Sequence, residues 1–268
     1  MKILKTKPKD YHCNCFYCKK FLGEIRNDDG SYISARKRIG YSDYEKKHKH
    51  IALGHWQGYS FAIDRLTKKG DIILDPFCGS ATALVEAAKL ERKGIGIELE
   101  FGKIAESNIK KYRSSVNILN GDCRNIVKTI KAEFDLILTG PVYNNHSDPP
   151  ERKNLKGKNQ SFDYKKKDSF SFMEDFEYQR EMLNLFGDLY AKTKKGGYFV
   201  LIIKDPIRNK EPYLLHRILT DCAEIAGYKP IGVYIHRHWP PTLFQNTYSK
   251  RFPKVKIPLY QTLTVLRK

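Results

Sequence analysis

Short apolar runs alternate with stretches of helical spacing along most of the chain from about residue 70 onward. Runs typical of buried strands occur at 71–77, 94–100, 116–122, 134–140 and 197–205. Apolar residues recur with helical spacing at 81–92, 102–112, near 170–192 and near 213–226. Strands that alternate with helices predict an α/β fold, in which a doubly wound, mostly parallel sheet is covered on both faces. The apolar stretches 230–239 and 259–268 are expected to close this sheet as a terminal hairpin pair.

The remaining segments divide the chain into an extension and a domain. Residues 1–50 are polar, basic and irregular, and they precede a periodic domain at 51–268. Two long connections, 144–169 and 236–258, interrupt the periodic pattern and carry both basic and aromatic side chains. Loops of this length are usually functional or disordered, and this composition suits phosphate contact and base stacking. We expect both to contact the target, and a solvated loop is the alternative for each.

A large excess of positive charge points to a polyanionic partner. The 268 residues hold 49 Lys and Arg against 30 Asp and Glu, a formal net charge of +19, together with 17 Tyr. Such an excess favours nucleic acid, although a lysine-rich solvated surface would have the same composition. No stretch approaches the roughly 20 apolar residues of a membrane span, and the start lacks the apolar run of a signal peptide. We therefore expect a cytoplasmic protein whose six cysteines stay reduced.

A glycine turn followed by two acidic residues predicts a nucleoside cofactor. The segment "DPFCGSATALVEA" (75–87) follows one predicted strand and opens a helix, and no G-K-[ST] follows it as in a phosphate-binding loop. Glu98 ends the next strand, where an acidic side chain suits paired ribose hydroxyls. Asp122 follows the third strand and is placed to contact an adenine amino group. The three features together describe a nucleoside without a pyrophosphate.

The motifs "DPFCGSAT", "GIELE", "NGD" and "LTGPVY" resemble those of the S-adenosylmethionine-dependent DNA amino-methyltransferases, which methylate adenine N6 or cytosine N4. The resemblance covers roughly residues 50–268 and implies a Rossmann-like fold of the class I methyltransferase type. The family turn usually reads D-P-F-x-G-S-G-T, and here Ala81 replaces one glycine. The upstream segment 54–66 is similar to the family segment that completes the cofactor pocket. The implied contacts to S-adenosylmethionine are Asp75, Phe77, Gly79, Ser80, Glu98, Asp122 and Trp56.

The catalytic motif of this family departs from its pattern here. The family reads [D/N/S]-P-P-[Y/F/W] after the fourth strand, and the matching residues are Gly140, Pro141, Val142 and Tyr143, followed by Asn144. In the family, the first side chain and the next carbonyl accept hydrogen bonds from the target amine, and the aromatic ring stacks on the flipped base. Pro141 and Tyr143 fit these roles. Gly140 has no side chain to accept a hydrogen bond, and Val142 loosens a rigid turn.

Three explanations of the missing acceptor stay open. Asn144, Asn145 or Asp148 substitutes for it, the enzyme is weakened or disabled, or the protein binds nucleic acid without chemistry. If the missing acceptor limits the reaction, Gly140→Ser or Gly140→Asp together with Val142→Pro should raise the methylation rate.

The expected function is methylation of an exocyclic amine in double-stranded DNA, within restriction–modification or by an orphan enzyme. Cytosine N4 is slightly favoured over adenine N6, because family members that act there often read Thr-Ser-Pro-Pro-Tyr and Thr139 is kept. Methylation of cytosine C5 needs a cysteine nucleophile, typically after proline, and the chain contains no Pro-Cys pair. The rival functions are an RNA amino-methyltransferase and a binding protein with a dead site.

A cysteine cluster near the start of the chain is a candidate metal site. Cys13, Cys15 and Cys18 are close enough in sequence to share one soft metal ion, by default zinc. Tetrahedral zinc needs a fourth ligand, for which the candidates are His48, His50 and His55. The alternatives are an iron–sulfur cluster, which lacks a fourth cysteine nearby, and three reduced cysteines without a metal.

Overall fold

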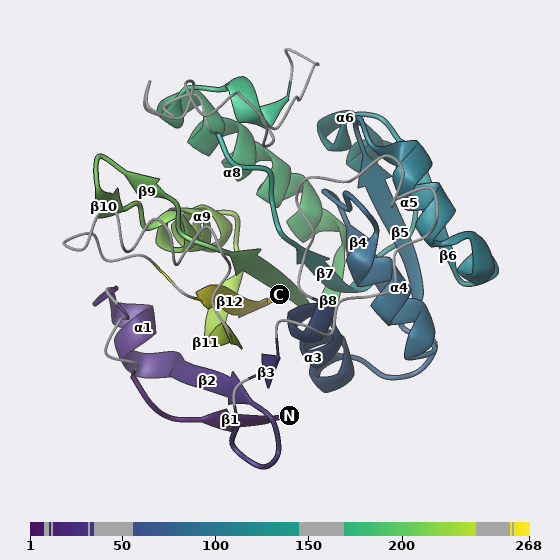
Figure 1. Cartoon of the computed structure of the whole chain (residues 1–268). Coiled ribbons are helices and arrows are strands. Elements are labelled where there is room, and N and C mark those ends of the chain that lie inside the picture. The colour runs from purple at the N-terminus through teal and green to yellow at the C-terminus, as the bar shows by residue number, and fades with distance from the viewer. Residues whose placement is uncertain are drawn as a thin grey trace, which may run out of the picture.

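One twisted sheet forms the centre of the molecule (Figure 1). The computed structural model describes residues 1–7, 11, 13–31, 33–34, 56–144, 169–239, 258 and 260–268. Within these residues the strand order is β1-β2-β11-β12-β8-β7-β4-β5-β6. The bounds of these strands, from one edge to the other, are Lys2–Leu4, Leu22–Arg26, Lys229–Trp239, Tyr260–Arg267, Thr193–Ile203, Phe134–Thr139, Ile72–Asp75, Lys93–Glu98 and Val116–Asn120. A short strand, β3 (Ile33–Ser34), pairs with β11, while β9 (Ile207–Arg208) and β10 (Glu211–Pro212) form a separate ribbon.

The sheet confirms the predicted α/β fold. Neighbouring strands from β8 through β7, β4 and β5 to β6 are parallel. The last strand, β12, runs antiparallel to both β8 and β11, so the two terminal apolar stretches do form the predicted hairpin pair. The order along the sheet reverses between β4 and β7, and the carboxyl ends of strands at such a switch point are where open α/β sheets bind ligands.

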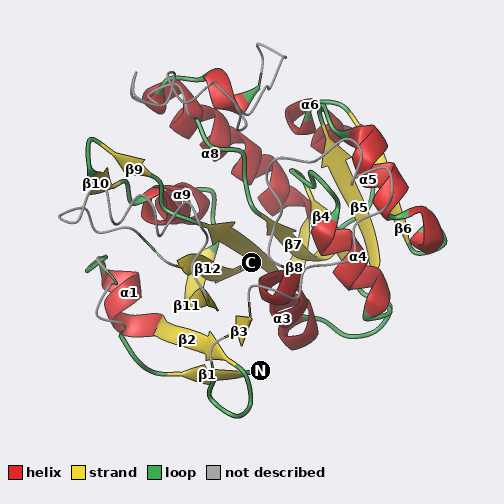
Figure 2. Cartoon of the chain, viewed as in Figure 1, coloured by secondary structure: helices red, strands yellow, loops and turns green. Residues whose placement is uncertain are grey.

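Helices cover both faces of the sheet (Figure 2). Their bounds are α3 (Trp56–Leu66), α4 (Thr82–Lys89), α5 (Gly102–Asn108), α6 (Cys123–Thr129), α8 (Asp175–Lys192) and α9 (Leu215–Ile225), with short 3-10 turns at Lys110–Tyr112 and Phe170–Phe172. Alternate residues of each strand enter opposite apolar clusters, as the two-residue period of a strand requires. Leu201 packs with residues of α6, α8 and α9, whereas Val200 packs with residues of α3 and α4. Two of the four apolar clusters among the described residues therefore pack helices against opposite faces of the sheet.

The start of the chain is more regular than its composition predicts. Residues 1–50 are expected to be irregular, yet their described part contains β1, β2 and helix α1 (Phe16–Phe21). Strand β2 pairs in parallel with β11 and thereby extends the central sheet, and β1 pairs with β2 at the edge. The purple N-terminal elements in Figure 1 lie beside β11 for this reason. Edge pairing supplied by a distant strand leaves little periodic signal in strands this short.

None of the helices in the described part of the chain is both long enough and apolar enough to span a bilayer.

Candidate active site

A cavity of about 220 Å³ opens at the carboxyl ends of β4, β5, β6 and β7. Its walls include residues 75–80 of the glycine turn, 97–99 at the end of β5, 121–124 after β6 and 140–143 after β7. The motifs that suggested a cofactor and the motif that suggested catalysis therefore face one space. Parallel strands bring them together because their carboxyl ends meet at the same edge of the sheet.

The glycine turn keeps its sharp shape although one glycine is replaced. Gly79 and Ala81 have φ values of 51° and 62°, in the left-handed region that glycine adopts most easily. Ala81 is fully buried and immediately precedes α4, so surrounding structure holds an alanine in this conformation. The Gly79 N–H donates to the Glu98 carboxylate over 2.8 Å. The turn is thus fixed to the end of the neighbouring strand.

The two predicted acidic contacts lie on the cavity wall. Besides Gly79, the Glu98 carboxylate accepts hydrogen bonds from the backbone N–H groups of Glu100 and Phe101, at 2.9 and 3.1 Å. Asp122 caps helix α6 by accepting from the Arg124 N–H, and its carboxylate also pairs with the Arg124 guanidinium at 2.5 Å. Both carboxylates therefore have fixed orientations beside the cavity.

Asp75 is an acid held in an apolar environment. Burial raises the pKa of its carboxyl to about 7, and hydrogen bonds from the Thr139 hydroxyl and the Phe77 N–H only partly offset the burial. The Thr139 Oγ1–Asp75 Oδ1 distance is 2.7 Å, and Thr139 is fully buried. Thr139, on which the preference for cytosine N4 rests, is therefore turned toward the glycine turn.

Hydrogen bonds of two tyrosines, Tyr178 and Tyr143, restrain the turn at 140–143. The Tyr178 hydroxyl donates to the Val142 carbonyl over 2.9 Å. The Lys204 N–H, just after β8, donates to the Tyr143 hydroxyl over 2.8 Å. These hydrogen bonds restrain a turn that lacks the second proline of the family pattern. The Pro141 carbonyl accepts no hydrogen bond from the described residues, and Tyr143 contributes to the cavity wall.

Both ends of the Asn144 amide are already used in hydrogen bonds. Its Nδ2 donates to Asp175 Oδ1 over 2.7 Å, and its Oδ1 accepts from the Arg208 guanidinium over 2.8 Å. Asn144 is buried and lies outside the cavity wall. The other two candidate acceptors, Asn145 and Asp148, lie outside the described residues, as do 145–168 and 240–257 of the predicted target-contacting insertions.

A side chain from another element takes the space beside Gly140. A Cβ at Gly140 would lie 3.1 Å from the Tyr59 hydroxyl oxygen and 3.3 Å from the Ile202 carbonyl oxygen. Tyr59, on α3, contributes to the cavity wall, and its hydroxyl has no hydrogen-bond partner among the described residues. Gln261 of β12 also lies on this wall, and its buried Oε1 likewise has no partner in the described part of the chain. The Tyr59 hydroxyl thus lies beside Gly140, where the family's acceptor side chain is missing, and Gln261 adds a second polar group to the cavity wall.

Sequence reasoning missed Tyr59, although the segment 54–66 that contains it resembles the one that completes the family's cofactor pocket. Only the three-dimensional contact with Gly140 distinguishes this tyrosine from the others. Among the predicted cofactor residues, Phe77 packs edge-on against Phe170 and Ser80 lies on the cavity wall. Trp56 lies at the start of α3 outside the wall, with the Lys89 ammonium 5.9 Å from its ring centroid.

The first part of the chain matches a known family. A family model described as DNA methylase matches residues 17–108, a span that includes the glycine turn and Glu98 and ends before β7. The type II methyltransferase M.EcaI of Enterobacter cloacae is 36% identical over 78 residues, which are 25% of this chain and 17% of that protein. M2.LlaDCHI of Lactococcus lactis subsp. cremoris, also a type II methyltransferase, is 34% identical over 116 residues, 41% of each protein.

One of the similar proteins is named as a tRNA methyltransferase. A probable tRNA (guanine(10)-N2)-dimethyltransferase of Methanothermococcus thermolithotrophicus is 32% identical over 85 residues, 28% of this chain and 52% of that protein. The chain spans about half or less of the length of these relatives.

Solved structures share the fold. TrmN from Thermus thermophilus has a TM-score of 0.50 at 16% identity, covering 80% of this chain and 48% of that one. The precorrin 8w decarboxylase of Methanobacterium thermoautotrophicum has a TM-score of 0.50 at 13% identity, covering 86% and 100%. Residues 17–108 thus match the DNA methylase family model, and the arrangement of the sheet is that of the class I methyltransferase fold.

Proposed function

We propose that this protein transfers a methyl group from S-adenosylmethionine to an exocyclic amino group of a base in DNA. The observation that carries the proposal is the single cavity shared by the glycine turn, Glu98 and the Gly140–Tyr143 turn. A cofactor bound along the first two would present its methyl group toward the third. The relatives named as type II methyltransferases support DNA as the substrate.

Several residues of the cavity wall are proposed to contact S-adenosylmethionine or to shape its site. Glu98 accepts hydrogen bonds from the ribose hydroxyls, and Asp122 lies near the adenine. The backbone around Gly79 and Ser80 approaches the cofactor closely because the turn is left-handed there. Asp75 and Phe77 stabilise the glycine turn, because the Asp75 carboxylate accepts a hydrogen bond from the Phe77 N–H over 3.1 Å.

Glu98→Ala is expected to weaken binding of S-adenosylmethionine by about 1.5–3 kcal/mol, roughly ten- to 150-fold, the range for charged hydrogen bonds. The loss includes the anchor of the Gly79 N–H, which the carboxylate also holds. Isothermal titration calorimetry measures the change, with Glu133→Ala, an acid away from the cavity, as the matched control. Equal affinities of wild type and Glu98→Ala would remove Glu98 from the cofactor site.

The target half of the proposal rests on acceptors for the amine. S-adenosylmethionine, when bound, would supply a sulfonium methyl group; in-line attack by an exocyclic nitrogen would form the N–C bond as the S–C bond breaks, leaving the thioether, and the nitrogen would lose one proton. The attack requires the nitrogen lone pair to be turned out of the base plane. We assign the Pro141 carbonyl and the Tyr59 hydroxyl as the two acceptors that hold the N–H groups in this orientation. A tyrosine hydroxyl retains acceptor lone pairs while it is protonated. Burial raises the pKa of Tyr59, and the nearby Asp75 and Tyr143 raise it further, so the hydroxyl stays protonated.

If the Tyr59 hydroxyl is an acceptor, restoring the family motif at 140–142 should not speed the reaction. Gly140→Ser with Val142→Pro adds the family's acceptor, but the new Cβ lies 3.1 Å from the Tyr59 oxygen. We expect the double variant to be no faster than wild type in single-turnover methylation, and about 1–3 kcal/mol less stable from overpacking. Val142→Pro alone is the control for the turn. A faster double variant would show that the acceptor was absent in the native protein.

The tRNA-modifying relative favours a second candidate, methylation of a guanine amine in RNA. Methyl transfer from radiolabelled S-adenosylmethionine to duplex DNA and to tRNA, measured side by side, separates the two. The proposal expects label in DNA. Label in tRNA alone would assign the protein to RNA. No label in either, with the cofactor bound, would indicate a binding protein.

A further inference from the structure

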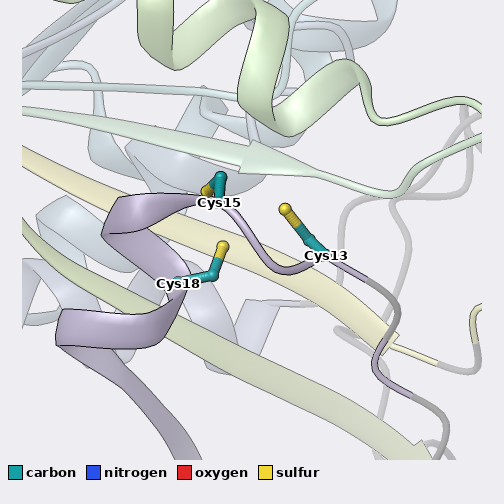
Figure 3. Close-up of side chains that lie close together, drawn as sticks. All are labelled: Cys13, Cys15 and Cys18. Carbon is teal, nitrogen blue, oxygen red and sulfur yellow. The ribbon is translucent and has the colours of Figure 1, made fainter.

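Three thiols converge at the start of helix α1. The Sγ atoms of Cys13, Cys15 and Cys18 all lie within 4.8 Å of one another. Cys13 and Cys18 are buried, and Figure 3 shows their sulfur atoms directed toward the same space. All three are free cysteines. A closed group of soft donors in a reduced protein is the arrangement that structural zinc sites use.

A fourth donor comes from the methyltransferase domain rather than from the N-terminal segment. His216, in the first turn of α9, is 2% exposed, and its Nε2 lies 3.7 Å from Cys18 Sγ. A tetrahedral zinc with bonds of about 2.3 Å to sulfur and about 2.05 Å to nitrogen places neighbouring S and N atoms about 3.6 Å apart. The observed spacing fits that value.

A buried carboxylate sets the direction of the histidine ring. Asp205 Oδ2 lies 2.6 Å from His216 Nδ1, and Asp205 Oδ1 accepts the His216 backbone N–H over 2.9 Å. Nδ1 is thereby engaged by Asp205, so Nε2 is the nitrogen presented to the sulfur atoms. Zinc-binding histidines are almost always oriented by such a carboxylate, carbonyl or water.

We propose that Cys13, Cys15, Cys18 and His216 bind one structural zinc ion, with Asp205 orienting His216. His216 takes the place of the candidates suggested by the sequence, His48, His50 and His55, which lie outside the described residues. Four protein ligands leave no open position, so the metal holds structure and takes no part in methyl transfer. It fastens the N-terminal segment, which supplies three ligands, to helix α9, which supplies the fourth.

The site also adjoins the catalytic turn, a consequence that rests on the proposed function. Asp205 follows directly after Lys204, whose N–H holds the Tyr143 hydroxyl. One strand end therefore carries the residue that orients the zinc ligand and the N–H that restrains the base-stacking tyrosine. Loss of the metal is expected to disorder both the orientation of His216 and the position of the Tyr143 side chain.

Elemental analysis of protein purified without added metal tests the site independently of methylation. We expect about one zinc per chain in wild type and near zero in Cys18→Ser and His216→Ala. Cys222→Ser is the matched control, because Cys222 is a buried cysteine on the same helix as His216 and should leave the zinc in place. Asp205→Asn should retain zinc with about ten- to hundredfold lower affinity in competition with a chelator.

Circular dichroism of each variant, with zinc offered in equimolar amount after refolding, separates a missing ligand from a failure to fold. Wild type that is folded and takes up no zinc overturns the site. Full zinc in folded His216→Ala, with none in Cys18→Ser, overturns His216 as the fourth ligand. Neither result would bear on cofactor binding or methyl transfer, which are tested by separate measurements.

Discussion

Tyr59→Phe is expected to slow methyl transfer by tens to hundreds of fold while changing cofactor affinity by no more than about twofold. A positioned hydrogen bond that strengthens in the transition state contributes roughly 2–4 kcal/mol. The substitution removes one oxygen, and that oxygen lies beside Gly140, where the family's acceptor side chain is absent. The aromatic ring of residue 59 stays packed in the apolar cluster that also contains residues of α4 and of the central strands. Single-turnover rates with saturating cofactor give the size of the effect.

Two further variants separate a missing acceptor from a disturbed core. Tyr198→Phe is the matched control, because Tyr198 packs against the same cluster and lies outside the cavity wall. Gly140→Ser in the Tyr59→Phe background should recover much of the rate, since the removed hydroxyl leaves room for the serine and the serine oxygen replaces it. Tyr59→Phe at the wild-type rate would eliminate this hydroxyl as the acceptor and leave Gln261 as the next candidate on the wall.

The affinity for duplex DNA should fall by about 10³–10⁵ between about 50 and 200 mM salt, as for proteins that contact six to ten phosphates. The net charge of +19 supplies the cations whose binding to phosphates releases counterions. Fluorescence anisotropy of a labelled duplex across this range gives the slope. Affinity for S-adenosylmethionine, which is not a polyanion, is the internal control and should change little. A flat response for DNA would contradict a nucleic-acid substrate.

Lysine substitutions can show which segment of the chain causes the salt dependence of DNA binding. Replacing Lys165 and Lys166 by alanine, in the predicted target-contacting insertion, should lower the slope by up to about 0.9 for each phosphate that these lysines neutralise. The same change at Lys110 and Lys111, two exposed lysines beyond α5, should leave it unaltered. Equal effects of the two pairs would mean that general charge, and not this insertion, determines binding.

The sequence predicted those parts of the protein that depend on local pattern. Apolar periodicity located the parallel strands, and the motifs that contain the glycine turn, Glu98 and Asp122 line one cavity, because each follows its own strand. Strand β2, which lies between β1 and β11, was missed because its partner β11 comes near the other end of the chain. Its five residues, LGEIR, are too few to show a strand period by themselves.

The two functional side chains added by the structure were hidden for the same reason. Tyr59 gains its role only by contact with Gly140, which belongs to a different element and motif. His216 lies 198 residues from Cys18, so ligand spacing along the chain could not connect them. A histidine on the buried face of an amphipathic helix is ordinarily a core residue, and only the convergence of Asp205 and the thiols distinguishes this one.

The identity of the methylated nucleoside tests the central claim most directly. Duplex DNA of mixed sequence is incubated with the protein and S-adenosylmethionine carrying an isotope-labelled methyl group, digested to nucleosides and resolved by mass spectrometry. The proposed chemistry predicts labelled N4-methylcytosine or N6-methyladenine, and little of either from Tyr59→Phe. Labelled 5-methylcytosine, or unlabelled DNA beside labelled RNA, would contradict the claim that this cavity methylates an exocyclic amine in DNA.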